Sequence, residues 1–79
     1  MTVSVRLFAM LREMAGSGRV ETAGRSVGEV ADALAEAYGE RFAAIVGVSS
    51  FVVNGERASR STVLAEGDEV AILPPVSGG

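Results

Sequence analysis

The first residues of the chain alternate between apolar and polar side chains. The apolar members are Val3, Val5 and Leu7. A period of two is typical of a β-strand with one buried face. Residues 10–14 then shift to a short helical turn, and residues 16–18 provide the glycines and serine that a chain reversal needs. Residues 19–22 are predicted to return as a second strand and form a hairpin with the first.

A longer helix is predicted to begin at Ser26, because its hydroxyl can cap free amides and Glu29, three residues later, can complete a capping box. The apolar positions that follow recur every 3.6 residues and form one stripe. They are Val27, Val30, Ala31, Leu34 and Tyr38. Gly39 is predicted to end this helix in a left-handed conformation.

The middle of the chain is less regular. Residues 42–48 are apolar without a clear period, so we predict only a connection that covers part of the core. Residues 51–53 are predicted as a strand. Asn54 and Gly55 form a strong hairpin signal, because both tolerate the positive φ of a type I′ turn. A short return strand is expected near Arg57.

The remaining segments complete the order of elements. Val63 and Leu64 are expected to form a short buried turn, residues 66–68 a loop, and residues 69–73 the last strand. This order predicts an α+β domain of the β-grasp, ubiquitin-like class, with a mixed sheet and one main helix packed on one face. Because a crossover helix favours parallel neighbours, the first and last strands are expected side by side in the middle of the sheet. The predicted domain spans residues 1–73.

The composition changes abruptly after the last predicted strand. Residues 74–79 are predicted to form an extended, flexible C-terminal tail, because Pro74 and Pro75 cannot donate ladder hydrogen bonds. Gly78 and Gly79 lack side chains, so this end can enter a narrow active site in which a Cβ would block access to the carbonyl carbon. A glycine pair also occurs by chance in frayed chain ends. The proline pair and the β-grasp pattern together favour a tail that presents its terminal carboxylate to the active site of a partner.

The residue types narrow the possible chemistry. The chain has no cysteine and no histidine, which excludes the usual zinc sites and the Cys and Ser-His nucleophile pairs. The carboxylate of Gly79 is a poor electrophile, so a partner must first convert it to an acyl-adenylate with ATP. Attack by sulfur on that anhydride would leave a thiocarboxylate. We therefore expect a carrier that binds no cofactor or metal itself and is not a catalyst alone.

The charge pattern argues against nucleic acid as a partner. All seven basic residues are arginines scattered among acids, and the net charge is −3. Without lysine, the chain offers no side-chain amine for an isopeptide bond to itself. The chain shows neither a signal-like start nor an apolar window near the roughly 18 residues of a membrane span. We expect a cytoplasmic protein with no membrane partner.

Three segments together carry a more specific pattern. They are Leu-Phe-Ala-Met-Leu-Arg-Glu at residues 7–13 with Gly16 shortly after, Val-Asn-Gly at residues 53–55, and the block 66–79 that ends in Pro-Pro-Val-Ser-Gly-Gly. They span nearly the whole chain, and the last block is the most specific. In these segments the sequence resembles the MoaD family, the small, sulfur-carrying subunit of molybdopterin synthase.

The resemblance implies a set of partners and a route for sulfur. An E1-like adenylating enzyme, similar to MoeB, would activate Gly79 with ATP, and a sulfur donor would supply the thiocarboxylate sulfur. The tail would then enter a large subunit similar to MoaE and donate sulfur to precursor Z, in a heterotetramer of two small and two large subunits. The essential glycine pair of the family falls on Gly78 and Gly79. Its tail-guiding prolines fall on Pro74 and Pro75, and Val76 and Ser77 are expected to contact the same partners.

A docking patch is predicted beside the tail. Phe8 and Leu73 fall on the polar, solvent-side face of their strands, and they are close together if the two strands are neighbours. Exposed apolar residues of this kind mark interaction sites, and Arg12 is a candidate polar anchor beside them. The alternative is that residues 42–48 fold over this face and bury both side chains.

Other acidic groups are interpreted as structural, and rival functions stay open. Asp32 and Glu36 form a pair on a solvated helix face, and residues 66–69 lack the ligand spacing of a calcium loop and indicate a turn. One rival is a sulfur carrier for thiamine thiazole, cysteine or tRNA thiolation. Another is a ubiquitin-like modifier that joins Gly79 to lysines of target proteins. A third is a plain interaction domain with an irrelevant tail.

Overall fold

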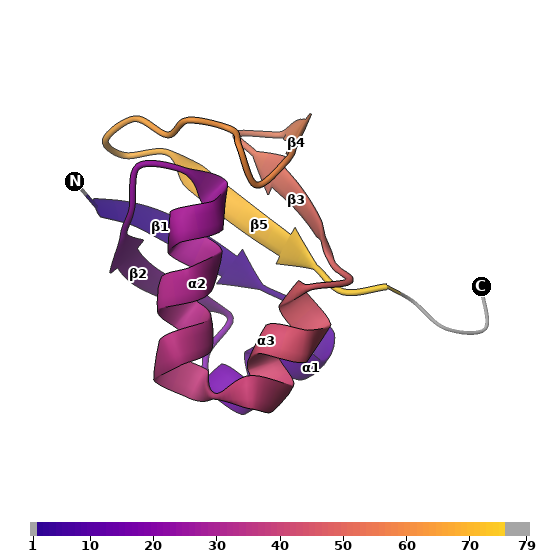
Figure 1. Cartoon of the computed structure of the whole chain (residues 1–79). Helices are drawn as coiled ribbons and strands as arrows, with labels where there is room; N and C mark the ends of the chain where they lie inside the picture. The colour runs from indigo at the N-terminus through magenta and orange to yellow at the C-terminus, as the bar shows by residue number, and fades with distance from the viewer. Residues whose placement is uncertain (1, 76–79) are drawn as a thin grey trace.

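A computed structural model of the chain describes residues 2–75. Five strands form one sheet, and α2 crosses one of its faces while α1 and α3 lie together near one end (Figure 1). The strands are β1 (Thr2–Leu7), β2 (Arg19–Ala23), β3 (Ser50–Val53), β4 (Glu56–Ala58) and β5 (Glu69–Leu73). The helices are α1 (Ala9–Ala15), α2 (Val27–Tyr38) and α3 (Glu40–Val46).

The strand order is β2-β1-β5-β3-β4, which places the first and last strands side by side in the middle of the sheet. β1 and β5 run parallel, with Val5 opposite Val70 and Leu7 opposite Ile72. The other neighbours are antiparallel, and Phe51 of β3 lies opposite Ile72. The predicted α+β, β-grasp arrangement with a central parallel pair is therefore confirmed.

The core lies between the inward face of the sheet and the helices. Alternate residues of β1 and β5 are buried in it, as the period of two predicts. The helical stripe is also buried, except that Tyr38 is only half-buried and places its ring centroid 5.1 Å from that of Phe42. The buried apolar residues are Val3, Val5, Leu7, Leu11, Val27, Val30, Ala31, Leu34, Phe42, Val46, Phe51, Leu64, Val70 and Ile72.

The ends of α2 differ in detail from the sequence prediction. The Ser26 hydroxyl accepts the amide of Glu29 at 3.2 Å, as expected for a cap. The Glu29 carboxylate accepts the amide of Arg25 at 2.9 Å, where a capping box would use the amide of Ser26. Gly39 has φ 99° and ψ −177°, so its φ is positive but it is not the left-handed helical cap that was predicted. This conformation lets α3 begin at Glu40 with no intervening loop.

Two predictions about connecting segments need correction. Residues 42–48 are not merely a connection, because most of them belong to α3, which buries Phe42 and Val46. The expectation that this segment covers part of the core is confirmed. The predicted buried turn is wrong for Val63, which is 80% exposed, while Leu64 is buried.

Candidate functional site

The base of the predicted tail lies where β5 leaves the sheet. β5 ends at Leu73, and the chain continues through a half-buried Pro74 and an exposed Pro75 away from the sheet (Figure 1). A groove of about 530 Å³ lies at this point. Its lining includes Val48, Val52, Arg57, Leu73, Pro74 and Pro75. The groove thus runs beside the first residues of the segment that leads to Gly79.

The face of the sheet opposite the helices carries an apolar strip. Leu73 and Ala71 alternate with the buried residues of β5 and therefore point to this helix-free face. Val52 is the cross-strand partner of Ala71, and Arg57 of β4 is the partner of Val52. Cross-strand partners share a face of the sheet. Val52, Ala71 and Leu73 therefore form a half-buried apolar strip on this face, and Arg57 borders the strip next to the groove.

Phe8 lies on the same face, one strand away from Leu73. It continues β1 with extended backbone angles, φ −130° and ψ 157°, before α1 begins. The guanidinium carbon of Arg6 lies 5.7 Å from the centroid of its ring, in a cation–π contact. Arg6 is the partner of Ala71 in β5, so these residues form a continuous surface. Below, the helix-free face formed by Arg6, Phe8, Val52, Ala71 and Leu73 is called the sheet patch.

The sheet patch is less exposed than the sequence indicated. Phe8 and Leu73 are both half-buried, whereas the strongly exposed large apolar residues among residues 2–75 are Met10, Val48 and Val63. The alternative that residues 42–48 fold over the patch is wrong, because Phe42 turns into the core on the opposite face. Val48 instead forms a wall of the groove beside Leu73. Sequence reasoning missed Val48 because it lay in a segment without a period, and it missed Val52 and Arg57 because register was unknown.

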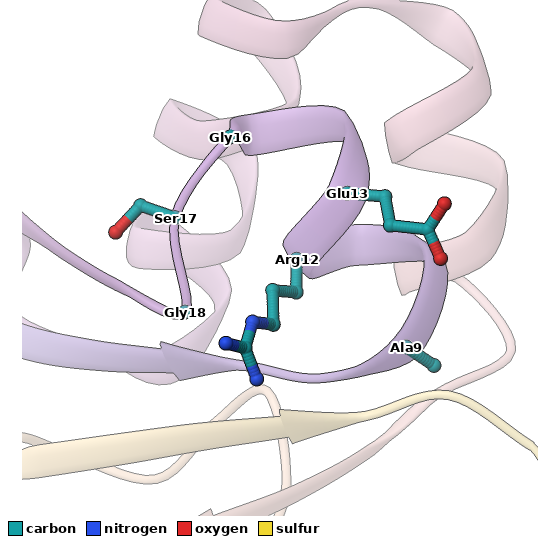
Figure 2. Close-up of a pocket in the computed structure, with 6 residues that line it drawn as sticks. All are labelled: Ala9, Arg12, Glu13, Gly16, Ser17 and Gly18. Carbon is teal, nitrogen blue, oxygen red and sulfur yellow. The ribbon is translucent and has the colours of Figure 1, made fainter.

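Arg12 follows Phe8 by four residues and lines a polar pocket of about 570 Å³ (Figure 2). α1 begins directly after Phe8, with Ala9 at φ 52°, and ends at Gly16 with φ 77°. The pocket is lined by Ala9, Arg12, Glu13, Gly16, Ser17 and Gly18. Figure 2 shows the guanidinium of Arg12 and the carboxylate of Glu13 extending in different directions from the helix. The structure thus places Arg12 in this pocket, and its role as a polar anchor stays a prediction.

Some acidic side chains of the described residues have structural partners. The Asp32 carboxylate pairs with Arg60 at 2.8 Å, and Glu69 pairs with Arg19 at 2.8 Å. The Asp68 carboxylate accepts the amide of Ala65 and the side-chain amide of Asn54, and these hydrogen bonds lower its pKa below the ordinary value of 3.8.

The described part of the chain shows neither a metal site nor a membrane-spanning helix. Residues 2–75 contain no group of three or more acids placed to hold a metal ion. In the same range, no helix combines the length and the apolar character needed to cross a membrane. Gly78 and Gly79, with Val76 and Ser77 before them, lie outside the described residues, so the chemistry expected there stays a prediction.

Comparison with known proteins identifies a family whose members match both the domain and the tail of this chain. The sequence profile of the ThiS family matches residues 5–79. The chain belongs to the ThiS family. This family groups small sulfur carriers and ubiquitin-like modifiers, and it also includes the MoaD proteins. The resemblance to MoaD is therefore confirmed at the level of the family. Its relatives are carrier proteins rather than catalysts.

Individual members of the family are similar over nearly their whole length. Small archaeal modifier protein 1 of Haloferax volcanii is 39% identical over 94% of this chain and 97% of its own. The solution structure of small archaeal modifier protein 1 from Methanosarcina acetivorans is 33% identical, covers 99% of this chain and 96% of its own, and gives a TM-score of 0.86.

Two structures of complexes also contain similar chains. One is the complex of subunits 1 and 2 of the molybdopterin-converting factor from Helicobacter pylori, with 28% identity, full coverage of both chains and a TM-score of 0.73. The other is the BexX/CysO complex from Amycolatopsis orientalis, with 27% identity, coverage of 98% of this chain and 99% of that one, and a TM-score of 0.81.

Proposed function

We propose that this ThiS family member carries sulfur on the carboxylate of Gly79. The carboxylate attacks the α-phosphorus of ATP in an E1-like enzyme, which releases pyrophosphate and forms an acyl-adenylate. Hydrosulfide delivered by a sulfur donor then attacks the carbonyl carbon, AMP leaves, and a thiocarboxylate remains. The protein itself supplies no catalytic side chain to these steps, and ATP is bound by the partner.

The placement of the base of the tail is the observation that carries this proposal. β5 is a central strand, and it delivers Pro74 and Pro75 directly from the middle of the sheet. The sheet patch and the groove lie beside that exit on the face that no helix covers. A partner that binds the patch would therefore hold Pro74 and Pro75, the base of the tail, at a defined position on its own surface. Pro74, Pro75, Val76 and Ser77 are proposed to lie along the entrance to the partner's active site.

The proposed destination of the sulfur is precursor Z, in the cytoplasmic synthesis of molybdopterin. The motif at residues 7–13 and the ending Pro-Pro-Val-Ser-Gly-Gly support this assignment. The similarity to subunit 1 of the molybdopterin-converting factor, which is in complex with subunit 2, supports it as well. The chain would then be the small subunit of molybdopterin synthase, with a large subunit similar to MoaE as acceptor and an enzyme similar to MoeB as activator.

Intact mass spectrometry tests the carrier function. The chain is incubated with the activating enzyme, ATP and a sulfur donor, and the expected product has one oxygen replaced by sulfur at Gly79. A variant with one additional residue after Gly79 is the matched control and is expected to remain unmodified. An unchanged mass with every candidate activating enzyme would refute the proposal. Addition of the large subunit and precursor Z then tests the pathway, since molybdopterin forms only if that assignment is correct.

A second candidate function is conjugation to other proteins. The 39% identity to a small archaeal modifier protein favours it. Both functions begin with the same adenylate, but a modifier ends in an amide between Gly79 and a target lysine. The last arginine is Arg60 and the chain has no lysine, so trypsin would leave residues 61–79 attached to any modified lysine. Detection of this remnant on target peptides supports a modifier, and its absence in cells that accumulate the thiocarboxylate supports a carrier alone.

A further inference from the structure

The polar pocket lined by Ala9, Arg12, Glu13, Gly16, Ser17 and Gly18 is called the Arg12 pocket below. The side chain of Arg12 packs against Gly18 on one side of this pocket. A Cβ added at Gly18 would lie 3.3 Å from Nε of Arg12 and 3.5 Å from its Cδ. The arginine side chain therefore lies directly against the backbone of Gly18, where a larger residue would displace it. The exposed side chain of Arg12 thus lies at the edge of the pocket beside residues 16–18 (Figure 2).

Among the residues that the structure describes, the charge of Arg12 has no partner. Arg19 and Arg60 each pair with a carboxylate, but Arg12 forms no ion pair or side-chain hydrogen bond within residues 2–75. Over the same range, the backbone amides of Ser17 and Gly18 have no hydrogen-bond acceptor. The pocket is thus lined by a residue with an unpaired guanidinium and by two residues with unused N–H groups, and groups of this kind can donate hydrogen bonds to an anion.

The pocket and the sheet patch are adjacent in the chain, because Ala9 of the pocket directly follows Phe8 of the patch. The carbonyl oxygen of Phe8 accepts the backbone amides of Leu11 and Arg12 at 3.1 and 3.4 Å, so the first turn of α1 holds the backbone of Arg12 close to that of Phe8. Ala9 adopts φ 52° at this turn, a conformation that costs a non-glycine residue energy and redirects the chain sharply. A protein that covers Phe8 would therefore lie close to Ala9, which lines the pocket.

We propose that the Arg12 pocket binds the side-chain carboxylate of an aspartate or glutamate on the enzyme that activates Gly79. A planar carboxylate matches the two parallel donors of a guanidinium and carries a single negative charge. A phosphate is disfavoured, because the pocket contains one cation and the carboxylate of Glu13 at its rim. Contact at the sheet patch alone leaves rotation about it poorly fixed, and a second, directional contact at Arg12 sets the orientation of the tail. The identity of the partner rests on the proposed function, whereas the affinity for carboxylate does not.

The first experiment tests the site without any partner. Sodium acetate is titrated into the isotope-labelled full chain at constant ionic strength, with sodium chloride as the balancing salt. Saturable NMR shifts are expected at Nε–H of Arg12 and at the amides of Ser17 and Gly18, and they should vanish in Arg12→Gln. Absence of these shifts, or equal shifts in the variant, would overturn the site.

The second experiment tests the partner by titration calorimetry with the activating enzyme. Arg12→Glu is expected to weaken binding on the order of tenfold or more, because a carboxylate would face the enzyme's carboxylate. Gly18→Ala is expected to weaken it by a smaller factor without any change in charge, since the added Cβ would lie 3.3 Å from Nε and shift the guanidinium by a few tenths of an ångström. Arg41→Glu, on α3 outside the pocket, makes the same charge change and is expected to have little effect. Matched circular dichroism spectra exclude misfolding as the cause.

The outcomes separate this inference from the proposed function. Equal losses for Arg12→Glu and Arg41→Glu would show a general charge effect and overturn the specific contact. A loss confined to the large subunit, with normal binding to the activating enzyme, would overturn the assigned partner. If the wild-type chain binds acetate at Arg12 but is never adenylated, the proposed function fails while the carboxylate site stands.

Discussion

Truncation of Phe42 to alanine tests how the fold supports the tail. Phe42 has no exposed surface and packs its ring against Tyr38. Loss of a buried phenylalanine costs about 3–5 kcal/mol, because transfer energy is lost and a cavity remains. A domain of 79 residues has a total stability of about 4–12 kcal/mol, at roughly 0.05–0.15 kcal/mol per residue. Phe42→Ala is therefore expected to remove a large share of the free energy of unfolding.

Urea unfolding followed by far-ultraviolet circular dichroism measures this change. With a slope near 1 kcal/mol per molar urea for a small domain, the midpoint should fall by about 3 M or more. The matched control is Phe8→Ala, which truncates a half-buried ring on the open face and is expected to cost less than about 2 kcal/mol. Phe8→Ala should instead slow adenylation of Gly79. A loss below about 1 kcal/mol for Phe42→Ala, or an equal loss for both variants, would refute the assignment of Phe42 to the core and Phe8 to the partner.

Three further predictions concern local structure. Ser26→Ala removes the hydroxyl that caps α2 and is expected to lower the free energy of unfolding by about 1 kcal/mol in urea titrations, while Ser26→Asp should retain most of it. Gly55→Ala forces a residue with a Cβ to φ 85°, so a loss of about 1–2 kcal/mol is expected, and an unchanged midpoint would contradict the turn geometry. The hydrogen bonds from Ala65 and Asn54 lower the pKa of Asp68, so its stabilising contribution is complete above its unfolded-state pKa and is lost as pH falls through the lower folded-state pKa. Asp68→Asn should therefore flatten the thermal midpoint as a function of pH below about 4, and an unchanged acid slope would disprove this role.

Local patterns were sufficient to predict most of the elements. Side chains alternate between the two faces of a strand and return to the same face of a helix every 3.6 residues. The buried positions of β1 and α2 can therefore be recognised in the sequence. The turn at Asn54 and Gly55 is equally local, because it needs two residues that tolerate positive φ, and both have it, at 50° and 85°. The central parallel pair followed from a general rule about crossovers rather than from any residue.

The segment 40–48 could not be predicted in the same way. α3 is only seven residues long, so its two buried residues, Phe42 and Val46, show a single repeat rather than a period. Its start depends on Gly39, which joins two helices directly with a φ of 99°. What decides that this segment is a helix is the space left uncovered beside α2, and that space exists only in the assembled domain.

Some residues of the candidate site were predicted from the sequence, and others were found only in the tertiary structure. Gly78, Gly79 and the two prolines were proposed from residue type alone, because the chemistry of an activated carboxylate depends on the covalent chain and on the lack of a side chain. The sequence also determined the one-domain β-grasp arrangement through its periodicities. Only the tertiary structure decided that Val48 and Val52 line a groove at the base of the tail and that the guanidinium of Arg12 lies against Gly18. Such contacts depend on strand register and on the packing of segments distant in sequence, neither of which a local pattern specifies.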